Sequence, residues 1–253
     1  MAECAFVVYK LVAAMFRAPV ETVPMQALTH DLDAMATAIG PWTRIVFVAN
    51  PNNPTGTVVS RDAIAAFMDR VPDDVIVCFD EAYIELLPES EQPPTLDYVR
   101  EGRNVIVLRT FSKTYGLAGL RVGYAVAPPE CIALLNRVRQ PFNVNAMALA
   151  AAEAALLDDD HVSRTRQLVS DGLQQFYAAF AEMGLSYVPS SANFVLVEVG
   201  QGRSCFEALQ KCGVIVRPMD GYGLPNHIRI TIGTRAENET CITALKAILA
   251  ARG

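Results

Sequence analysis

Lysine is scarce in this sequence, with four residues against seventeen arginines. Histidine is scarcer still, and its three residues lie far apart, so we expect no histidine-rich metal site. The six cysteines contain no Cys-x-x-Cys pair, which argues against a zinc site or a disulfide framework and favours reduced core residues. The formal net charge of -6 argues against a protein that binds nucleic acid through its overall charge.

Long apolar runs are also missing. No window is long enough for a transmembrane helix, and the N-terminus has no basic flank followed by a signal-type core. We therefore expect a cytoplasmic protein that has no membrane partner. The 253 residues are 52% hydrophobic, which is enough to bury one large core or two smaller ones.

The sequence does contain short apolar runs that end in polar clusters. Three of them, residues 44–49, 74–79 and 104–108, are predicted as buried strands with helices between them. Strands and helices alternating at this spacing predict a mostly parallel sheet, and ligands bind beyond the carboxyl ends of such strands. The clusters that follow the strands are Asn50 to Gly56, Asp80 to Tyr83, and Thr110 to Arg121.

The predicted fold is therefore α/β, with a mostly parallel sheet, flanking helices and a smaller C-terminal α+β domain. We expect a large cofactor-binding domain at 1–157 and a small domain at 158–253. In the first part we expect a short strand or loop entry at 6–9, helices near 11–16, 28–39 and 60–68, and strands at 20–23 and 122–126. In the second part we expect helices at 145–157, from about 158 to 183, at 205–210 and from the capping box Thr234–Glu237, with strands at 186–188, 194–199, 214–216 and 227–232.

Lys113 lies within the third polar cluster, between hydroxyl residues. A lysine amine at a strand end becomes useful as an imine with a carbonyl cofactor, and the aldehyde that also needs an anion cradle and a carboxylate is pyridoxal phosphate. Asp80 would keep the pyridine nitrogen protonated, and Tyr83 would donate to the phenolic oxygen. The catalytic candidates are Lys113, Asp80 and Tyr83, and the other cofactor candidates are Asn53 for the phenolic oxygen, Thr110, Ser112 and Arg121 for the phosphate, and Phe6 for ring stacking.

Each of these residues has a plainer interpretation when it is taken alone. A lysine after a strand is usually a solvated end, and Asp80 is more often a turn or a helix cap. Phe6 is more often a core residue, and an arginine in a strand, such as Arg229, is usually an exposed cross-strand partner. The order of the candidates along the chain and their shared place at strand ends favour a single site.

The segments Asn50-Pro-Asn-Asn-Pro-Thr-Gly56, Asp80-Glu-Ala-Tyr83 and Ser112-Lys113 with Arg121 resemble, in this order, the cofactor signature of the fold-type I aminotransferases. The resemblance implies the aspartate aminotransferase-like fold, the cofactor roles given above and, for the full-length family, a homodimer. The chain is most similar to the histidinol-phosphate aminotransferases, through residues 139–145, 193–195, 216–219 and 227–233.

That resemblance implies transamination of histidinol phosphate in histidine biosynthesis, with 2-oxoglutarate as the amino acceptor. It also implies that Arg229 takes the acidic group of the substrate and that Arg217 helps to bind the substrate phosphate. A guanidinium suits carboxylate and phosphate equally. Three alternative functions therefore remain open. The chain could be an aromatic amino-acid aminotransferase, a phosphothreonine decarboxylase-like lyase or an inactive fragment.

One departure from the family concerns the N-terminus. Family members carry a substantial segment before the position of Phe6, with an arm toward the partner subunit and a Gly-rich loop that helps to hold the cofactor phosphate. We therefore expect a large domain that is incomplete at its N-terminus and a chain that binds the cofactor poorly by itself.

Overall fold

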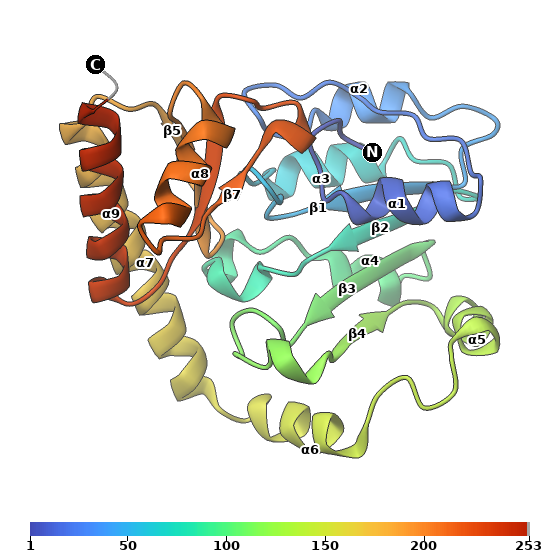
Figure 1. The fold of residues 1–253 in the computed structure, drawn as a ribbon. Helices are drawn as coiled ribbons and strands as arrows, with labels where there is room; N and C mark the ends of the chain where they lie inside the picture. Colours follow the sequence, from blue (N-terminus) through green and yellow to red (C-terminus); the bar gives the residue numbers. More distant parts are fainter. Residues whose placement is uncertain (252–253) are drawn as a thin grey trace.

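Two four-stranded sheets organise the computed structural model, which describes residues 1–251 (Figure 1). The first sheet has the order β1-β2-β3-β4. Its strands β1 (Ile45–Ala49), β2 (Ile76–Asp80) and β3 (Val105–Thr110) are parallel, and β4 (Gly123–Val126) runs antiparallel to β3. The mostly parallel sheet predicted from the apolar runs is confirmed.

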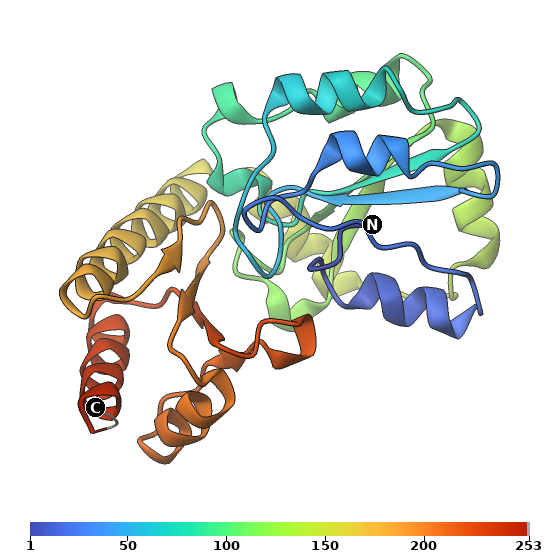
Figure 2. The same cartoon turned by 90° about the horizontal axis from the view of Figure 1, so that it is seen from above.

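Helices cover both faces of this sheet (Figure 2). Alternate residues of a strand point to opposite faces, so Val46 and Val48 face one side and Phe47 and Ala49 face the other. The first side forms a core with α2 (Leu32–Thr37), α3 (Arg61–Met68) and α4 (Thr95–Arg100). The second side packs against the N-terminal residues and α1 (Val8–Met15), where the Tyr9 ring stacks on Phe47 with centroids 4.6 Å apart.

Short polar side chains begin many of the helices. Asp31, Ser60, Asn145 and Asp158 each accept a hydrogen bond from a backbone N–H in the first turn of the following helix. These are the starts of α2, α3, α6 (Ala146–Ala155) and α7 (Asp159–Glu182). The capping box predicted at Thr234 and Glu237 begins α9 (Arg235–Ala250).

The second sheet is antiparallel and has the order β5-β6-β8-β7. Its strands are β5 (Tyr187–Val188), β6 (Phe194–Glu198), β7 (Arg217–Pro218) and β8 (His227–Thr231). Helices α7, α8 (Gly202–Lys211) and α9 share one apolar core with this sheet. Gly172 allows α7 to pack closely against the end of β8, because a Cβ at position 172 would lie 2.3 Å from Ile232 Cγ2.

The two sheets are joined by contacts between distant parts of the chain. The Ser191 N–H donates to the Gly56 carbonyl at 2.8 Å, and the Arg166 guanidinium on α7 donates to the Glu85 carbonyl. Gly56 has φ 76°, and a Cβ there would lie 2.1 Å from Ser190 Oγ. The turn after β1 is therefore held directly against the second sheet. We retain the division at 157/158 as a proposal, because α7 begins there and leads from one sheet to the other.

Several predicted elements were wrong in position. Residues 6–9 form no strand, since Tyr9 already belongs to α1, and residues 20–23 make only an isolated bridge between Val23 and Ala2. The helix predicted at 28–39 is shorter, because Leu28 has a left-handed backbone (φ 60°) and the helix begins after Asp31. The strand predicted at 214–216 lies instead at Arg217–Pro218, where it pairs with β8. Helix α5 (Pro129–Val138) and the 3-10 turns at 84–86, 89–91, 118–120 and 220–222 had not been predicted.

All six cysteines are free thiols, four of them buried, while Cys131 is partly exposed and Cys212 is exposed. In residues 1–251 there is no helix with the length and apolar character needed to cross a bilayer.

Candidate active site

A small cavity opens beyond the carboxyl ends of β1 and β2, on the side of the first sheet that faces α1. Five residues predicted from the sequence line it, together with four others. The predicted five are Phe6, Asn53, Asp80, Tyr83 and Lys113, and the others are Tyr9, Ala49, Pro51 and Ala82. The fold therefore brings together side chains from three strand ends and from the N-terminal residues.

Asp80 is the last residue of β2, and its carboxylate is held on both oxygens. The Tyr9 hydroxyl donates to Oδ2 at 2.5 Å, and the Ala82 N–H donates to Oδ1 at 3.2 Å. Burial raises the pKa of Asp80, while the hydrogen bonds from Tyr9 and Ala82 and the charge of Lys113 oppose that rise. The carboxylate is thus fixed in place and has acceptor capacity left for a cationic or N–H ligand.

Tyr9 was not predicted as a site residue. It is 6% exposed, its ring stacks on Phe47, and burial next to the charge of Asp80 raises the pKa of its phenol, which therefore remains a donor. Local sequence gave no sign of this role, because Tyr9 and Asp80 are 71 residues apart. The three-residue spacing from Phe6, which puts both rings in edge-to-face contact at 5.8 Å, would have been the available signal.

Lys113 lies in the loop after β3, and its ammonium is over the Tyr83 ring at 5.5 Å from the centroid. Among the described residues it has no hydrogen-bond partner. Burial lowers the pKa of Lys113, the nearby charges of Arg229 and Arg121 lower it further, and Asp80 opposes them. A larger fraction of this amine is therefore neutral near pH 7 than of an ordinary lysine.

Arg229 connects the second sheet to the cavity. It lies on β8, donates from Nη1 to the Asn53 side-chain oxygen, and stacks over the Phe194 ring at 4.7 Å. Its Nε is buried without a hydrogen-bond partner, and burial lowers the pKa of its guanidinium. A buried N–H without an acceptor is costly, so Arg229 is a group that an incoming anion can satisfy. This contradicts the plainer interpretation of Arg229 as an exposed cross-strand residue.

Tyr83 lies under the Lys113 ammonium and next to Phe194, the ring over which Arg229 stacks. Its ring makes an edge-to-face contact with Phe194 at 5.4 Å, and burial raises its pKa to about 12, an effect that the charge of Arg229 opposes. The phenol is therefore a hydrogen-bond donor at neutral pH. Asn53, whose oxygen is taken by Arg229, keeps its amide N–H groups as donors.

Arg217 is exposed and lies directly opposite Arg229 in the β7–β8 pair. Two guanidinium groups on neighbouring strands repel each other, as the lowering of the Arg229 pKa by Arg217 indicates. An anion between them relieves that repulsion.

The three predicted phosphate residues form a cluster of their own. The Ser112 N–H donates to Thr110 Oγ1 at 3.1 Å, and Arg121 Nη1 lies 3.5 Å from Ser112 Oγ. Arg121 has a left-handed backbone (φ 55°), and its guanidinium also donates to the Ala118 carbonyl at 2.6 Å. These residues do not line the small cavity, although the charge of Arg121 reaches Lys113. The structure thus places them outside the lining of the cavity, as a separate polar cluster, and their role in binding the phosphate stays a prediction.

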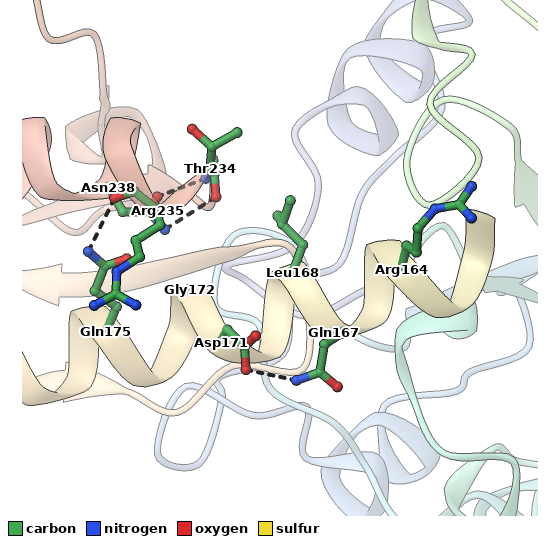
Figure 3. A pocket seen from close by; sticks show the side chains of 10 residues that line it. Arg164, Gln167, Leu168, Asp171, Gly172, Gln175, Thr234, Arg235 and Asn238 are labelled. Carbon is green, nitrogen blue, oxygen red and sulfur yellow. Dashed lines mark hydrogen bonds between the residues drawn. The ribbon is translucent and has the colours of Figure 1, made fainter. Parts of the chain in front are cut away.

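A larger hollow lies elsewhere, between α7 and the start of α9 (Figure 3). Its polar groups bind each other: Asn238 exchanges two hydrogen bonds with the Gly233 backbone, and Gln175 donates to the Arg235 carbonyl. None of its lining side chains is a buried polar group without a partner among residues 1–251. The candidate site is therefore the smaller cavity.

Residues 1–245 match the family model "Aminotransferase class I and II". Histidinol-phosphate aminotransferase 2 of Ralstonia nicotianae is 53% identical over 98% of this chain and 68% of its own length, and the histidinol-phosphate aminotransferase of Akkermansia muciniphila is 52% identical over the same shares. The chain spans about two thirds of these relatives.

Solved structures show the same fold. Histidinol-phosphate aminotransferase from Sinorhizobium meliloti, in complex with pyridoxal-5'-phosphate, superposes with a TM-score of 0.91 at 29% identity, covering 100% of this chain and 70% of that one. A protein from Erwinia carotovora atroseptica described as a putative histidinol-phosphate aminotransferase gives 0.92 at 27% identity, covering 99% and 74%. The predicted aspartate aminotransferase-like fold is confirmed. The chain belongs to the class I and II aminotransferase family.

Proposed function

We propose that this chain carries out pyridoxal-phosphate-dependent transamination of histidinol phosphate in histidine biosynthesis, with 2-oxoglutarate as the amino acceptor. The observation that carries the proposal is the pairing, in one cavity, of an amine without a hydrogen bond and a carboxylate fixed by two donors. The curated relatives at about half identity carry this activity in their names, and the Sinorhizobium structure holds this cofactor.

The residues of the cavity fit the cofactor. When bound, pyridoxal phosphate supplies an aldehyde for an amine and a protonated ring that accepts electrons from the substrate. Lys113 would hold it covalently and Asp80 would pair with its ring nitrogen. Tyr83 and Asn53 have donors for its phenolic oxygen, and Phe6 has a ring to stack on it. Thr110, Ser112 and Arg121 are the candidates for its phosphate.

Lys113 is the group that moves the proton. Burial and the nearby positive charges lower its pKa, which favours the neutral amine, so it can accept a proton from the substrate carbon and return it at the neighbouring carbon. Asp80 would pair with the ring nitrogen through a carboxylate that Tyr9 and Ala82 hold in place, and their hydrogen bonds favour its charged form. Tyr83 donates a hydrogen bond and keeps its proton, since burial raises its pKa to about 12.

Arg229 and Arg217 are proposed to bind the acidic groups of the two substrates. The free Nε of Arg229 suits the carboxylate of the amino acceptor, and the exposed Arg217 opposite it suits the phosphate of the amino donor.

The activity test uses the chain with saturating pyridoxal phosphate. A visible absorbance band of the lysine-linked cofactor should form, and glutamate should appear when histidinol phosphate and 2-oxoglutarate are added. Aromatic amino acids and phosphothreonine serve as competing donors, and released carbon dioxide is measured with the latter. Turnover of an aromatic donor alone, or decarboxylation, would contradict the proposed substrate. A cofactor band without any turnover would indicate a fragment that binds but is inactive.

Pairing with a second copy of the chain is proposed as part of this function. Support comes from exposed apolar side chains on α1 and around α5 and α6, which include Met15, Phe16, Val138, Phe142 and Met147 at 77–100% exposure. We propose that the protein acts in the cytoplasm. Analytical ultracentrifugation over a concentration series tests the pairing, and a monomer at all concentrations would contradict it.

A further inference from the structure

Glu81 follows Asp80 directly, yet its carboxylate points to the other side of the sheet. Residues alternate along β2, so Val77, Phe79 and Glu81 belong to the face that packs against α3 and α4, whereas Asp80 faces α1. Glu81 is 1% exposed, although it is an acidic residue. A carboxylate buried to this extent is stable only when hydrogen bonds and an opposite charge compensate for its lost hydration.

The partners of Glu81 come from α4 and β3. The Thr95 hydroxyl donates to Oε1, and Arg109 donates to Oε2 from Nε at 2.9 Å and lies 2.8 Å from it with Nη2. Thr95 is fully buried, and the Arg109 side chain is only 20% exposed. The Glu81 N–H also donates to the Leu108 carbonyl at 2.9 Å. One residue thus joins β2 to β3 through both its backbone and its side chain.

The position of this pair in the chain gives it significance for the site. Glu81 lies between Asp80 and Tyr83, and Arg109 precedes Thr110, Ser112 and Lys113. The ion pair therefore links, from behind the sheet, the segment that carries the carboxylate to the segment that carries the amine. A buried ion pair contributes little net stability compared with apolar side chains of similar size, so stability alone is a weak reason for it.

We propose that Glu81 and Arg109 are positioning residues, which fix the separation of the Asp80 carboxylate and the Lys113 amine across the ends of β2 and β3. Neither of them lines the cavity. This inference rests on the proposed function, because it assigns a purpose to that separation. Thr95 orients the carboxylate and belongs to the same cluster.

The test uses a double variant, Glu81→Gln with Arg109→Met, which removes both charges and leaves an oxygen for Thr95. The matched control is Glu182→Gln with Lys246→Met, since that pair joins α7 to α9 at 2.7 Å, is exposed and lies far from the cavity in sequence and fold. Thermal unfolding checks that both variants fold. The first readout is the pKa of Lys113 in the cofactor-free chain, obtained from the pH dependence of its acylation, followed by peptide mass spectrometry.

We expect the Lys113 pKa to rise toward the ordinary lysine value in the folded double variant, because a loosened amine gains contact with water. We expect the dissociation constant of pyridoxal phosphate, measured from its visible band, to rise about tenfold, as is typical when a supporting contact behind a binding residue is lost. The control pair should change neither quantity. An unchanged Lys113 pKa and unchanged affinity in a folded double variant would overturn the proposal.

A second variant decides the matter if the double variant does not fold. Arg109→Lys keeps the charge but cannot direct two N–H groups at one carboxylate oxygen. We expect smaller rises in the Lys113 pKa and in the dissociation constant of pyridoxal phosphate in this variant. An unaltered Lys113 pKa would contradict a positioning role. Failure of the proposed function gives a different pattern: the unmodified chain would then form no cofactor band, while the acylation measurement would still report whether the pair sets the pKa of Lys113.

Discussion

Two hollows of this protein differ in size and in chemistry, and the smaller one is the candidate active site. The groove between α7 and α9 has a volume of about 660 Å³, against about 80 Å³ for the cavity at the ends of β1 and β2. In the groove, the polar atoms of Asn238 and Gln175 bind neighbours in the protein. At the cavity, Lys113 has no hydrogen-bond partner among residues 1–251, and Arg229, which donates to the lining residue Asn53, has a buried Nε without a partner.

The difference teaches that unsatisfied polar groups mark a site better than volume does. Folding normally pairs buried polar atoms, so the unpartnered buried Nε of Arg229, next to a lysine with no protein hydrogen bond, favours an anionic ligand at the smaller cavity. The five substitutions that follow test this contrast, beginning with the largest expected effect.

Lys113→Ala should have the largest effect. It removes the amine that is proposed to hold the cofactor and to move the proton, so transamination should fall by about 10²- to 10⁴-fold and the visible band of the lysine-linked cofactor should disappear. Absorbance spectra and glutamate formation measure these two effects. Lys246→Ala, on the exposed face of α9, is the matched control. If Lys113→Ala kept both the cofactor band and the activity, the smaller cavity would no longer be distinguished from the groove as the active site.

Asp80→Asn should come next. The amide keeps the shape of the side chain but loses the charge beside the ring nitrogen, so kcat should fall by about 10²- to 10³-fold. The amide oxygen can still accept from the Ala82 N–H, and the amide NH2 can donate to the Tyr9 hydroxyl, so the fold should remain intact. Steady-state kinetics measure the loss of turnover, and a thermal melt shows whether the variant is folded. Normal turnover in the Asn variant would mean that the charge of Asp80 is not used.

Arg229→Lys should weaken substrate binding. Lysine keeps the charge but loses the planar fork, which costs about 1.5–3 kcal/mol, or roughly 10- to 150-fold in KM for 2-oxoglutarate. The cofactor band should remain, because Lys113 and Asp80 are untouched. Arg203→Lys, in an exposed pair with Asp220, is the control. If KM stayed constant while the band was lost, Arg229 would serve the cofactor and not the substrate.

Tyr9→Phe should have a moderate effect that depends on pH. The hydrogen bond from Tyr9 lowers the pKa of Asp80, so its loss raises that pKa further. The carboxylate is then protonated at a higher pH on the acid side, and activity should begin to fall at a higher pH than in the unmodified chain. A profile of kcat/KM against pH measures this. A shift of the acid limb to lower pH would contradict the interpretation.

Gln175→Ala in the groove should have the smallest effect. Gln175 donates only to Arg235 and Glu239 on the exposed side of α9, so unfolding free energy should change by about 0.5 kcal/mol or less and activity should not change. Chemical denaturation and the glutamate assay measure the two quantities. Loss of activity here would show that the larger hollow takes part in the reaction, and the contrast would fail.

Part of the site could be predicted because its signals are local. Asp80 and Lys113 follow apolar runs that can only be buried strands, and parallel strands bring their carboxyl ends to one edge. The turn from Asn50 to Gly56 was equally visible, since Pro, Asn and Gly determine turns over four residues. Helix starts at Ser60 and Thr234 were predicted for the same reason.

Other parts depend on long-range packing, which short windows of sequence do not encode. Arg229 reaches Asn53 across 176 residues, and Tyr9 reaches Asp80 across 71. The run at 6–9 was taken for a strand or loop entry because its apolar residues suit either structure, and contact with Phe47 decided in favour of a helix containing Tyr9.

The sequence by itself predicted the candidates for the chemistry. Local pattern gave Asp80 at the end of one apolar strand and Lys113 shortly after another, and the family resemblance added Arg217 and Arg229. Tertiary structure alone decided how they are held and which remain unsatisfied. The Glu81–Arg109 pair behind the sheet and the Tyr9 hydroxyl in front of it exist only once separate strands and helices have packed. The physical reason is that strand and helix starts depend on a few neighbouring residues, whereas hydrogen bonding in a cavity depends on every element that surrounds it.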